Sequence, residues 1–265
     1  MSLPRIAIAT GDPAGIGPEI ALKAALDARV RSLCRPLLVG DPAVLGLHAK
    51  ASGLSANFQV IELVADADWT YGAVNLLNAG GGSNVPLKFG TVDAAYGRAS
   101  LASARRAIKA ALADEVDAVV AAPQTERSIA AAGITFDGYP SFVARETGTP
   151  VNDVYLMICF DDKRIVHATL HVSVREAIAL ITPERVERVI RVTDTALRKL
   201  GIAEPKIFVS GLNPHAGEEG MFGLEEIEII TPSIKRAAAQ GIDVSGPFGS
   251  DTVFHKKGCD AFIVM

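Results

Sequence analysis

Two histidines that follow predicted strands are the residues of this sequence best suited to metal binding or acid–base chemistry. His215 lies in the segment 211–226, GLNPHAGEEGMFGLEE, directly after an apolar run that predicts a buried strand. His171 follows a second predicted strand, residues 164–170. Open α/β sheets bind ligands in the crevice at the carboxyl ends of their strands. The sequence therefore predicts one site that contains both histidines, as metal ligands or as acid–base groups.

These two histidines supply only part of a metal site, because a catalytic zinc ion usually takes three protein ligands and one open position. Asp251, in a loop rich in glycine and serine, is the nearest carboxylate that would extend the set. An Asx turn is the alternative role for this aspartate, and both stay open. His167 and His171 have the H-x-x-x-H spacing of zincins, but the glutamate is missing and the segment reads as a strand, so we exclude that motif.

A glycine-rich loop after the first predicted strand is a second candidate site. Gly11, Gly15 and Gly17 would let the backbone approach a ligand closely, and Pro18 suits the first turn of a helix whose N-terminus favours an anion. The spacing GxxxGxG is neither the dinucleotide fingerprint nor a P-loop. A ligand-binding loop and a merely tight turn therefore both remain open. His48 is expected on a surface helix and receives no function.

Composition bounds the class of protein. The chain has 265 residues, of which 49% are hydrophobic and 21% charged, which suits one large α/β domain or two smaller lobes. A net charge of −4 argues against nucleic-acid binding. No apolar run approaches the roughly 18 residues of a membrane span, and the N-terminus lacks a signal peptide. The three cysteines never have CxxC spacing. We therefore expect a reduced, cytoplasmic protein with no nucleic-acid or membrane partner.

The order of elements predicts an α/β fold. Residues 154–160 and 164–170 read as strands separated by only three residues, too few for a crossover helix, so they should form an antiparallel hairpin in a mixed sheet. Residues 245–251 are expected to be a loop. The chain ends on an apolar strand, residues 260–265, with no helix after it to cover the strand, so we expect the sequence to be truncated. Further strands are predicted at residues 5–10, 35–40, 58–64, 117–122 and 206–210.

Several segments resemble the 4-hydroxythreonine-4-phosphate dehydrogenase family of vitamin B6 (pyridoxine) biosynthesis, in the same order and from residue 5 to the last residue. The resemblance implies a three-layer α/β/α fold like that of isocitrate and isopropylmalate dehydrogenases. It also implies two interleaved lobes around a cleft, which form a single dehydrogenase unit over residues 1–265, and a homodimer with the active site at the subunit interface. The matching segments are GDPAGIGPE at 11–19, TLH at 169–171 with Arg175, GLNPHAGE at 211–218 with Glu225 and Glu226, and SDT at 250–252.

The resemblance also implies a reaction. Family members oxidise the secondary alcohol of a hydroxy acid with NAD or NADP and then lose CO2, and 4-phosphohydroxy-L-threonine is the default substrate. A divalent metal (Zn, Mg or Co) held by three histidines lowers the pKa of the substrate hydroxyl. Two of these histidines match His171 and His215, and the third is expected beyond Met265. Asp251 matches an aspartate near the metal, which could bind it or orient a ligand. The glycine loop could serve the cofactor or the substrate.

Two departures from the family pattern concern the substrate. This chain has Tyr139, Pro140 and Ser141 where the family has a His-Thr-Glu sequence whose His-Thr pair contacts the substrate, and Met221 where the family has a histidine. We expect the three substituted residues to bind a different substrate in the same type of reaction. An aromatic cis-dihydrodiol carboxylate or a sugar-acid phosphate would fit. Outside dehydrogenases, a metallohydrolase or a non-catalytic sugar-phosphate-binding module is the alternative.

Overall fold

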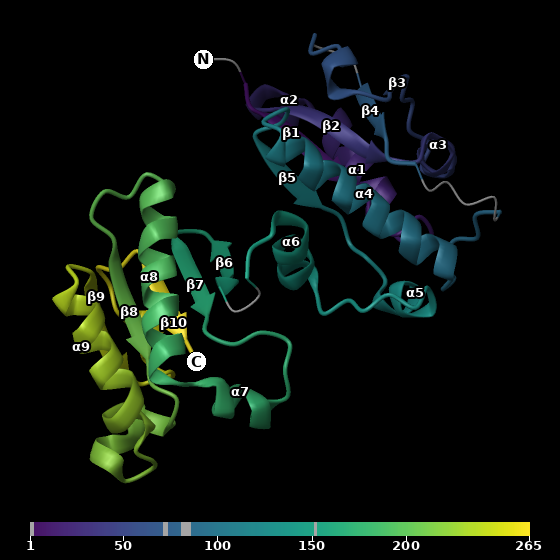
Figure 1. The fold of residues 1–265 in the computed structure, drawn as a ribbon. Helices are drawn as coiled ribbons and strands as arrows, with labels where there is room; N and C mark the ends of the chain where they lie inside the picture. The colour runs from purple at the N-terminus through teal and green to yellow at the C-terminus, as the bar shows by residue number, and fades with distance from the viewer. Residues whose placement is uncertain (1–2, 71–73, 81–85, 151–152) are drawn as a thin grey trace. The chain divides into compact units, whose positions relative to one another are not determined.

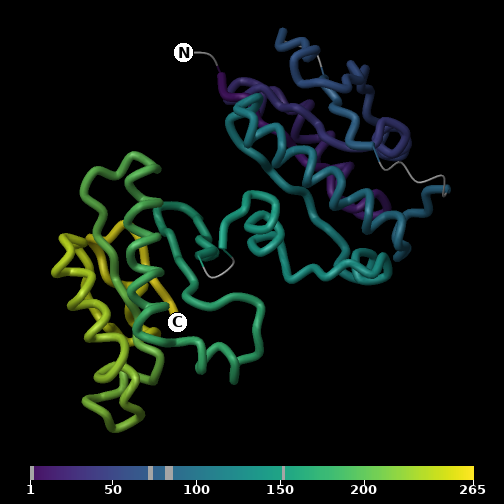
Figure 2. Tube along the Cα trace, viewed as in Figure 1, coloured from purple at the N-terminus to yellow at the C-terminus, as the bar shows by residue number. Residues whose placement is uncertain are grey.

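The computed structural model describes residues 3–70, 74–80, 86–150 and 153–265. The chain divides into two compact units, Met1–Gly148 and Thr149–Met265. Each unit is one continuous stretch of sequence, as the colours of Figures 1 and 2 show, and each contains a five-stranded sheet within the described residues. The predicted α/β class is confirmed. The interleaving of the two lobes stays a prediction.

The first unit is built on a parallel sheet with the strand order β3-β4-β2-β1-β5. Its strands are β1 (Arg5–Ala9), β2 (Arg35–Gly40), β3 (Phe58–Ile61), β4 (Val74–Asn78) and β5 (Ala118–Ala121). Its helices are α1 (Gly17–Leu26), α2 (Ala28–Leu33), α3 (Pro42–Ala51), α4 (Ala94–Leu112), α5 (Glu126–Ala131) and α6 (Tyr139–Thr147), with a 3-10 turn at Val64–Asp66.

Alternate residues of the central strands of this sheet fill two separate cores. Ile8, Leu38 and Leu76 pack with residues of α1 and α3 on one face. Ala7 and Leu37 pack with residues of α4 on the other face. A parallel sheet needs such cover on both sides, because its strands are apolar on both faces. The first unit therefore has the three layers, helix, sheet and helix, that the family resemblance implied.

Aspartate side chains cap the helices α2, α3 and α4 of this unit. Asp41 accepts hydrogen bonds from the backbone N–H groups of Ala43 and Val44 at the start of α3, and Asp93 caps α4 in the same way. The helix predicted from Pro18 onward ends at Leu26. Asp27 is extended at φ −68° and ψ 125°, and its carboxylate accepts from the backbone N–H of Arg29, which ends α1 and begins α2.

The second unit contains a mixed sheet with the strand order β6-β7-β10-β8-β9. Strand β6 runs antiparallel to β7 and the other pairs are parallel, so the predicted hairpin is confirmed. The strands are β6 (Leu156–Phe160), β7 (Lys163–His167), β8 (Lys206–Ser210), β9 (Asp243–Phe248) and β10 (Ala261–Val264). The helices are α7 (Val174–Leu180), α8 (Pro183–Lys199) and α9 (Thr231–Ala239), with 3-10 turns at Pro214–Gly220 and Val253–His255 and a π turn at Glu226–Ile230.

The two faces of this sheet are filled by different residue types. On one face, aliphatic side chains of the strands, such as Val209 and Ile263, pack with residues of α8 and α9. Among the aromatic contacts, the ring of Phe208 lies 5.1 Å from that of Phe248 and 6.3 Å from that of Phe262, measured between centroids. Phe208 lies between Ile207 and Val209 on β8, so alternation along the strand places it on the face opposite these two core residues.

Two strands were not predicted. Strand β9 includes Gly246 and Pro247, which indicated a loop at residues 245–251, and that prediction was wrong for Ser245 to Phe248. Strand β9 is the last strand of its sheet, and an edge strand tolerates a proline because one of its sides forms no ladder. Strand β4 lies inside the first sheet, between β3 and β2, although its sequence showed no clear alternation. Among the described residues, no helix is long and apolar enough to cross a membrane.

Candidate functional site

The loops that carry the two predicted histidines leave the same edge of the second sheet. Strands β7 and β8 both pair in parallel with β10, so their carboxyl ends point in one direction. His171 lies beyond the end of β7 with a φ of 36°, and His215 lies beyond the end of β8. Both side chains are exposed. Their position at the carboxyl ends of the strands is the one expected of a ligand site in an open α/β sheet.

The structure brings His215 together with Asp251. The Nδ1 atom of His215 lies 3.9 Å from an Oδ atom of Asp251, and each side chain is 59% exposed. Two contacts hold the Asp251 loop against the start of the His215 loop. The hydroxyl of Ser250 donates to the carbonyl oxygen of Gly211 at 2.8 Å, and the backbone N–H of Gly211 donates to the carbonyl oxygen of Phe248 at 2.7 Å.

This pair fits part of a metal coordination shell. Imidazole nitrogens and carboxylate oxygens both bind divalent cations, the imidazole favouring zinc and other transition metals. Within the described residues, no three or more His, Cys, Asp or Glu side chains gather closely enough to hold an ion. His215 and Asp251 therefore offer two adjacent donors. The roles of His171 and of a third histidine beyond Met265 stay predictions.

His215 begins a left-handed turn that the sequence did not reveal. Five consecutive residues have positive φ angles, 52° at His215 and between 39° and 80° at the next four. Only one of the five, Gly217, is a glycine, and each of the others costs about 1–2 kcal/mol in this conformation. Such strain persists only where the surroundings fix it, and it concentrates at functional sites. The turn gives His215 a defined direction in an otherwise exposed loop.

The glycine loop of the first unit is a tight turn at the carboxyl ends of β1 and β5. Gly11 has a φ of 74°, and a Cβ atom there would overlap the carbonyl oxygen of Pro123 and lie 2.9 Å from that of Ala122. The side chain of Asp12 is 1% exposed, and its Oδ1 atom accepts from the backbone N–H of Ala14 at 2.8 Å. Its Oδ2 atom has no hydrogen-bond partner among the described residues. This buried acceptor leaves a ligand role for the loop open.

His48 supports this loop, contrary to expectation. Its side chain is 4% exposed, its Nε2 atom lies 2.8 Å from the carbonyl oxygen of Pro13, and its ring packs edge-on against Phe89 at a centroid distance of 4.7 Å. The expectation of a surface histidine was wrong. The signal was present in the sequence, because His48 follows the buried Leu45 by three residues and precedes the buried Ala49, which places all three on one helical face.

Residues 32–265 match the model of the family described as pyridoxal phosphate biosynthetic protein PdxA. The chain belongs to this family. It is 36% identical over 259 residues to the D-threonate 4-phosphate dehydrogenase of Cupriavidus necator, an alignment that covers 97% of this chain and 76% of the relative.

Two solved structures of named dehydrogenases are similar to the chain. The 4-hydroxythreonine-4-phosphate dehydrogenase of Klebsiella pneumoniae superimposes with a TM-score of 0.88 at 32% identity, covering 99% of this chain and 80% of that one. The terephthalate 1,2-cis-dihydrodiol dehydrogenase of Burkholderia xenovorans superimposes with a TM-score of 0.67 at 37% identity, covering 99% and 79%. The predicted family and the predicted dehydrogenase class are thereby confirmed.

The three residues that stand in place of the family's His-Thr-Glu sequence form the first turn of α6. The hydroxyl of Tyr139 donates to the carbonyl oxygen of Ala122 at 2.9 Å, and burial raises the pKa of this tyrosine above its ordinary value. Ser141 is 9% exposed, and Pro140 is half-buried. Tyr139 thus contacts the strand end beside the glycine loop. Contact of Tyr139, Pro140 or Ser141 with a substrate stays a prediction.

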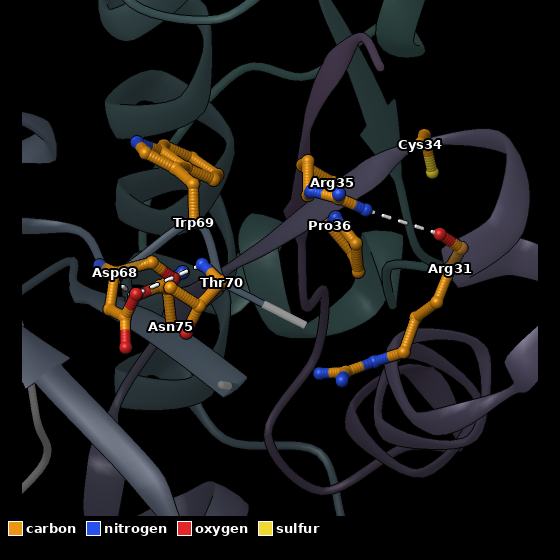
Figure 3. A pocket seen from close by; sticks show the side chains of 8 residues that line it. All are labelled: Arg31, Cys34, Arg35, Pro36, Asp68, Trp69, Thr70 and Asn75. Atoms are coloured by element: carbon orange, nitrogen blue, oxygen red, sulfur yellow. Dashed lines mark hydrogen bonds between the residues drawn. The ribbon is translucent and has the colours of Figure 1, made fainter. Parts of the chain in front are cut away.

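A separate pocket of the first unit lies near the amino end of β2 (Figure 3). Its polar groups hydrogen-bond within the protein: the guanidinium of Arg35 donates to the carbonyl oxygen of Arg31 at 3.3 Å, and the backbone N–H of Thr70 donates to Asp68 at 2.9 Å. Ligands of parallel sheets bind at the opposite, carboxyl ends of the strands. We therefore do not assign the active site here. The lining residues are Arg31, Cys34, Arg35, Pro36, Asp68, Trp69, Thr70 and Asn75.

Proposed function

We propose that this protein is a metal-dependent NAD(P) dehydrogenase that oxidises a phosphorylated four-carbon hydroxy acid and releases CO2. The observation that carries the proposal is the match to the PdxA family, together with the His215–Asp251 pair at the carboxyl edge of the second sheet. D-threonate 4-phosphate is the first substrate to test, because a relative of that name is 36% identical over 97% of the chain. 4-Phosphohydroxy-L-threonine is the second.

The two substrates share the chemistry that the reaction needs. Each has a secondary alcohol at the carbon β to the carboxylate, so its oxidation gives a β-keto acid that can lose CO2. They differ at the α carbon, which bears a hydroxyl in one and an ammonium group in the other. The change to Tyr139, Pro140 and Ser141 supports a substrate other than phosphohydroxythreonine, because the family's His-Thr pair is absent. NAD or NADP would serve as the hydride acceptor.

His215 and Asp251 would hold the divalent metal, with zinc, cobalt and magnesium as the ions to test. The bound cation supplies Lewis-acid polarisation of a substrate oxygen. Asp251 either binds the ion or accepts a hydrogen bond from the imidazole of His215 and so fixes its ring. We include His171 as a further ligand because it leaves the same sheet edge. We also propose a cytoplasmic homodimer in which the second copy completes the site.

The proposal is tested by following NAD(P) reduction at the absorbance of the reduced nicotinamide. The substrate panel comprises the two phosphorylated acids and an aromatic cis-dihydrodiol carboxylate, which the Burkholderia xenovorans structure favours as the alternative. We expect turnover of a phosphorylated acid that EDTA abolishes and added metal restores. Turnover of the dihydrodiol alone would replace the substrate proposal, and phosphate release without NAD(P) reduction would favour a hydrolase.

A matched pair of variants tests the metal ligand. His215→Ala should lower metal content and kcat/KM at least about 100-fold, because loss of a ligand exceeds the 10–100-fold effect of losing a group that only supports one. His255→Ala makes the same change at an exposed histidine of a neighbouring 3-10 turn and should leave both within about twofold. Unchanged activity in the His215 variant would sink the ligand assignment.

A further inference from the structure

Glu226 is a buried carboxylate at the base of the loop that carries His215. Glu226 is only 3% exposed and is the first residue of the π turn before α9. Its Oε1 atom accepts hydrogen bonds from the backbone N–H groups of Leu212 and Asn213, both at 2.7 Å. Its Oε2 atom accepts from the side-chain amide of Asn213 at 2.8 Å. Both carboxylate oxygens are therefore bonded to the segment that leads into His215.

The loop is shaped around this carboxylate. A Cβ atom on Gly211 would lie 3.0 Å from the Oε1 atom of Glu226, and one on Gly217 would lie 2.7 Å from the Oε2 atom. Glycine at these two positions thus allows a backbone approach that any other residue would block. Among the described residues, no Lys, Arg or His forms an ion pair with Glu226. Its hydrogen bonds go to the loop, so its role is to hold the loop rather than to balance a charge.

Asn213 transmits this restraint to the left-handed turn. Its backbone N–H and its side-chain amide are bonded to Glu226, and its carbonyl oxygen accepts from the backbone N–H of Ala216 at 3.1 Å. That last bond closes the turn whose first residue is His215. Glu226 therefore fixes one end of the turn, and the turn fixes the direction of the His215 side chain.

We propose that Glu226 is the positioning residue of His215: it holds the strained left-handed turn in place through Leu212 and Asn213. The inference rests on the proposed function in that it takes His215 as a metal ligand. Glu226 itself does not touch the metal or the substrate. Its effect is to order the loop before any ligand binds. Metal binding then loses less conformational entropy, because the imidazole of His215 is already held in place.

Glu225 provides a matched control one residue away. It is half-buried, and its carboxylate accepts a hydrogen bond from the side-chain amide of Asn213 at 2.7 Å. That hydrogen bond holds the pKa of the Glu225 carboxyl below its ordinary value. Glu226→Gln and Glu225→Gln remove the same charge from adjacent residues. The glutamine at 226 has one acceptor oxygen in place of two, so either the bond from the Asn213 side-chain amide or the bonds from the two backbone N–H groups must be lost, whereas Glu225→Gln leaves the bonds of Glu226 to Leu212 and Asn213 intact.

The first test uses protein freed of metal with EDTA, so that it does not depend on activity. Limited proteolysis with chymotrypsin probes the loop, because this protease cleaves after large apolar residues and Met221 and Phe222 are 73% and 48% exposed. We expect cleavage within residues 212–224 to be at least tenfold faster in Glu226→Gln than in the wild-type protein, and within about twofold of wild type in Glu225→Gln. Equal cleavage rates in the two variants overturn the proposal. If Glu226→Gln fails to fold, Asn213→Ala, which removes one of the three bonds, should show the same change to a smaller degree, and a wild-type rate in that variant would count against the proposal.

The second test is a titration with Co²⁺ alone, followed by visible absorption. We expect Glu226→Gln to bind Co²⁺ at least tenfold more weakly and to show an altered spectrum, whereas Glu225→Gln keeps the wild-type affinity and spectrum. A purely structural role would lower thermal stability without changing the spectrum of the bound ion, and that result overturns the positioning role. If the wild-type protein does not bind Co²⁺, the assignment of His215 as a ligand of this ion fails, and the cleavage rates alone decide whether Glu226 holds the loop.

Discussion

Substitution of Gly11 by alanine should destabilise the first unit and distort the glycine loop. Gly11 has a φ of 74°, which an alanine adopts at a cost of about 1–2 kcal/mol. The new Cβ atom would also overlap the carbonyl oxygen of Pro123, a backbone atom that cannot rotate away. Moving Pro123 breaks the hydrogen bond that its carbonyl accepts from the backbone N–H of Asp12 at 3.1 Å, worth about 1 kcal/mol. The expected loss of stability is therefore at least about 2–3 kcal/mol.

Gly46 provides the control for this substitution. It lies inside α3 on the exposed side, and a Cβ atom there would meet nothing within 4 Å. Because alanine is a better helix former than glycine, Gly46→Ala should stabilise the unit by about 1 kcal/mol. The two variants make the same chemical change and should differ in sign.

Urea unfolding, monitored by the fluorescence of Trp69, measures the stability of the first unit in both variants. Trp69 is the single tryptophan of the chain and packs against a core of the first unit. We expect the unfolding midpoint to fall for Gly11→Ala and to rise for Gly46→Ala. If Gly11→Ala unfolds at the wild-type urea concentration, the glycine is not required by the turn, and the reasoning from its φ angle and from Pro123 is refuted.

Three further predictions follow from burial. His48→Ala should cost about 1–3 kcal/mol in urea unfolding, because it leaves the carbonyl oxygen of Pro13 buried and unbonded, and a cost near zero would contradict that role. Iodoacetamide at pH 8 should alkylate exposed Cys159 before Cys259, because burial and the neighbouring aspartate raise the pKa of Cys259 to about 11. The rate of Cys259 alkylation, followed by mass spectrometry, should rise about tenfold per pH unit from pH 8 to 10. Burial raises the pKa of Tyr139, so above about pH 10 the folded state keeps a proton that the unfolded state loses. The free energy of unfolding should therefore fall as the pH rises past that value. When urea midpoints at pH 8 and 10.5 are compared, Tyr139→Phe should show a smaller fall than the wild-type protein.

The features that were predicted correctly from the sequence depend on residues that lie close together along the chain. The gap of three residues after Phe160 permits only a hairpin, and strands β6 and β7 form one. Strand β9 was missed because the tolerance of Pro247 depends on its place at the edge of the sheet. That place is set by the partner strand β8, which lies far away in the sequence.

In the candidate site, too, some features were predicted from the sequence and others were not. The positions of His171 and His215 at one sheet edge were predicted, because each follows an apolar strand. The left-handed turn was not predicted, since Ala216, Glu218 and Glu219 belong to residue types that rarely adopt positive φ angles. It exists because Glu226 and the glycines of the loop meet in three dimensions. Their contacts have no periodicity or local spacing from which a sequence could reveal them.

The most direct test of the central claim is the stoichiometry of the reaction with D-threonate 4-phosphate. The protein, supplied with a divalent metal and NAD or NADP, should form one reduced nicotinamide for each CO2 released, and EDTA should stop both. Reduced nicotinamide without CO2 would show oxidation at the α carbon or a β-keto acid that keeps its carboxylate, and either result would contradict the proposed decarboxylation. The account is contradicted if neither this acid nor 4-phosphohydroxy-L-threonine reduces the cofactor with any of the three metals.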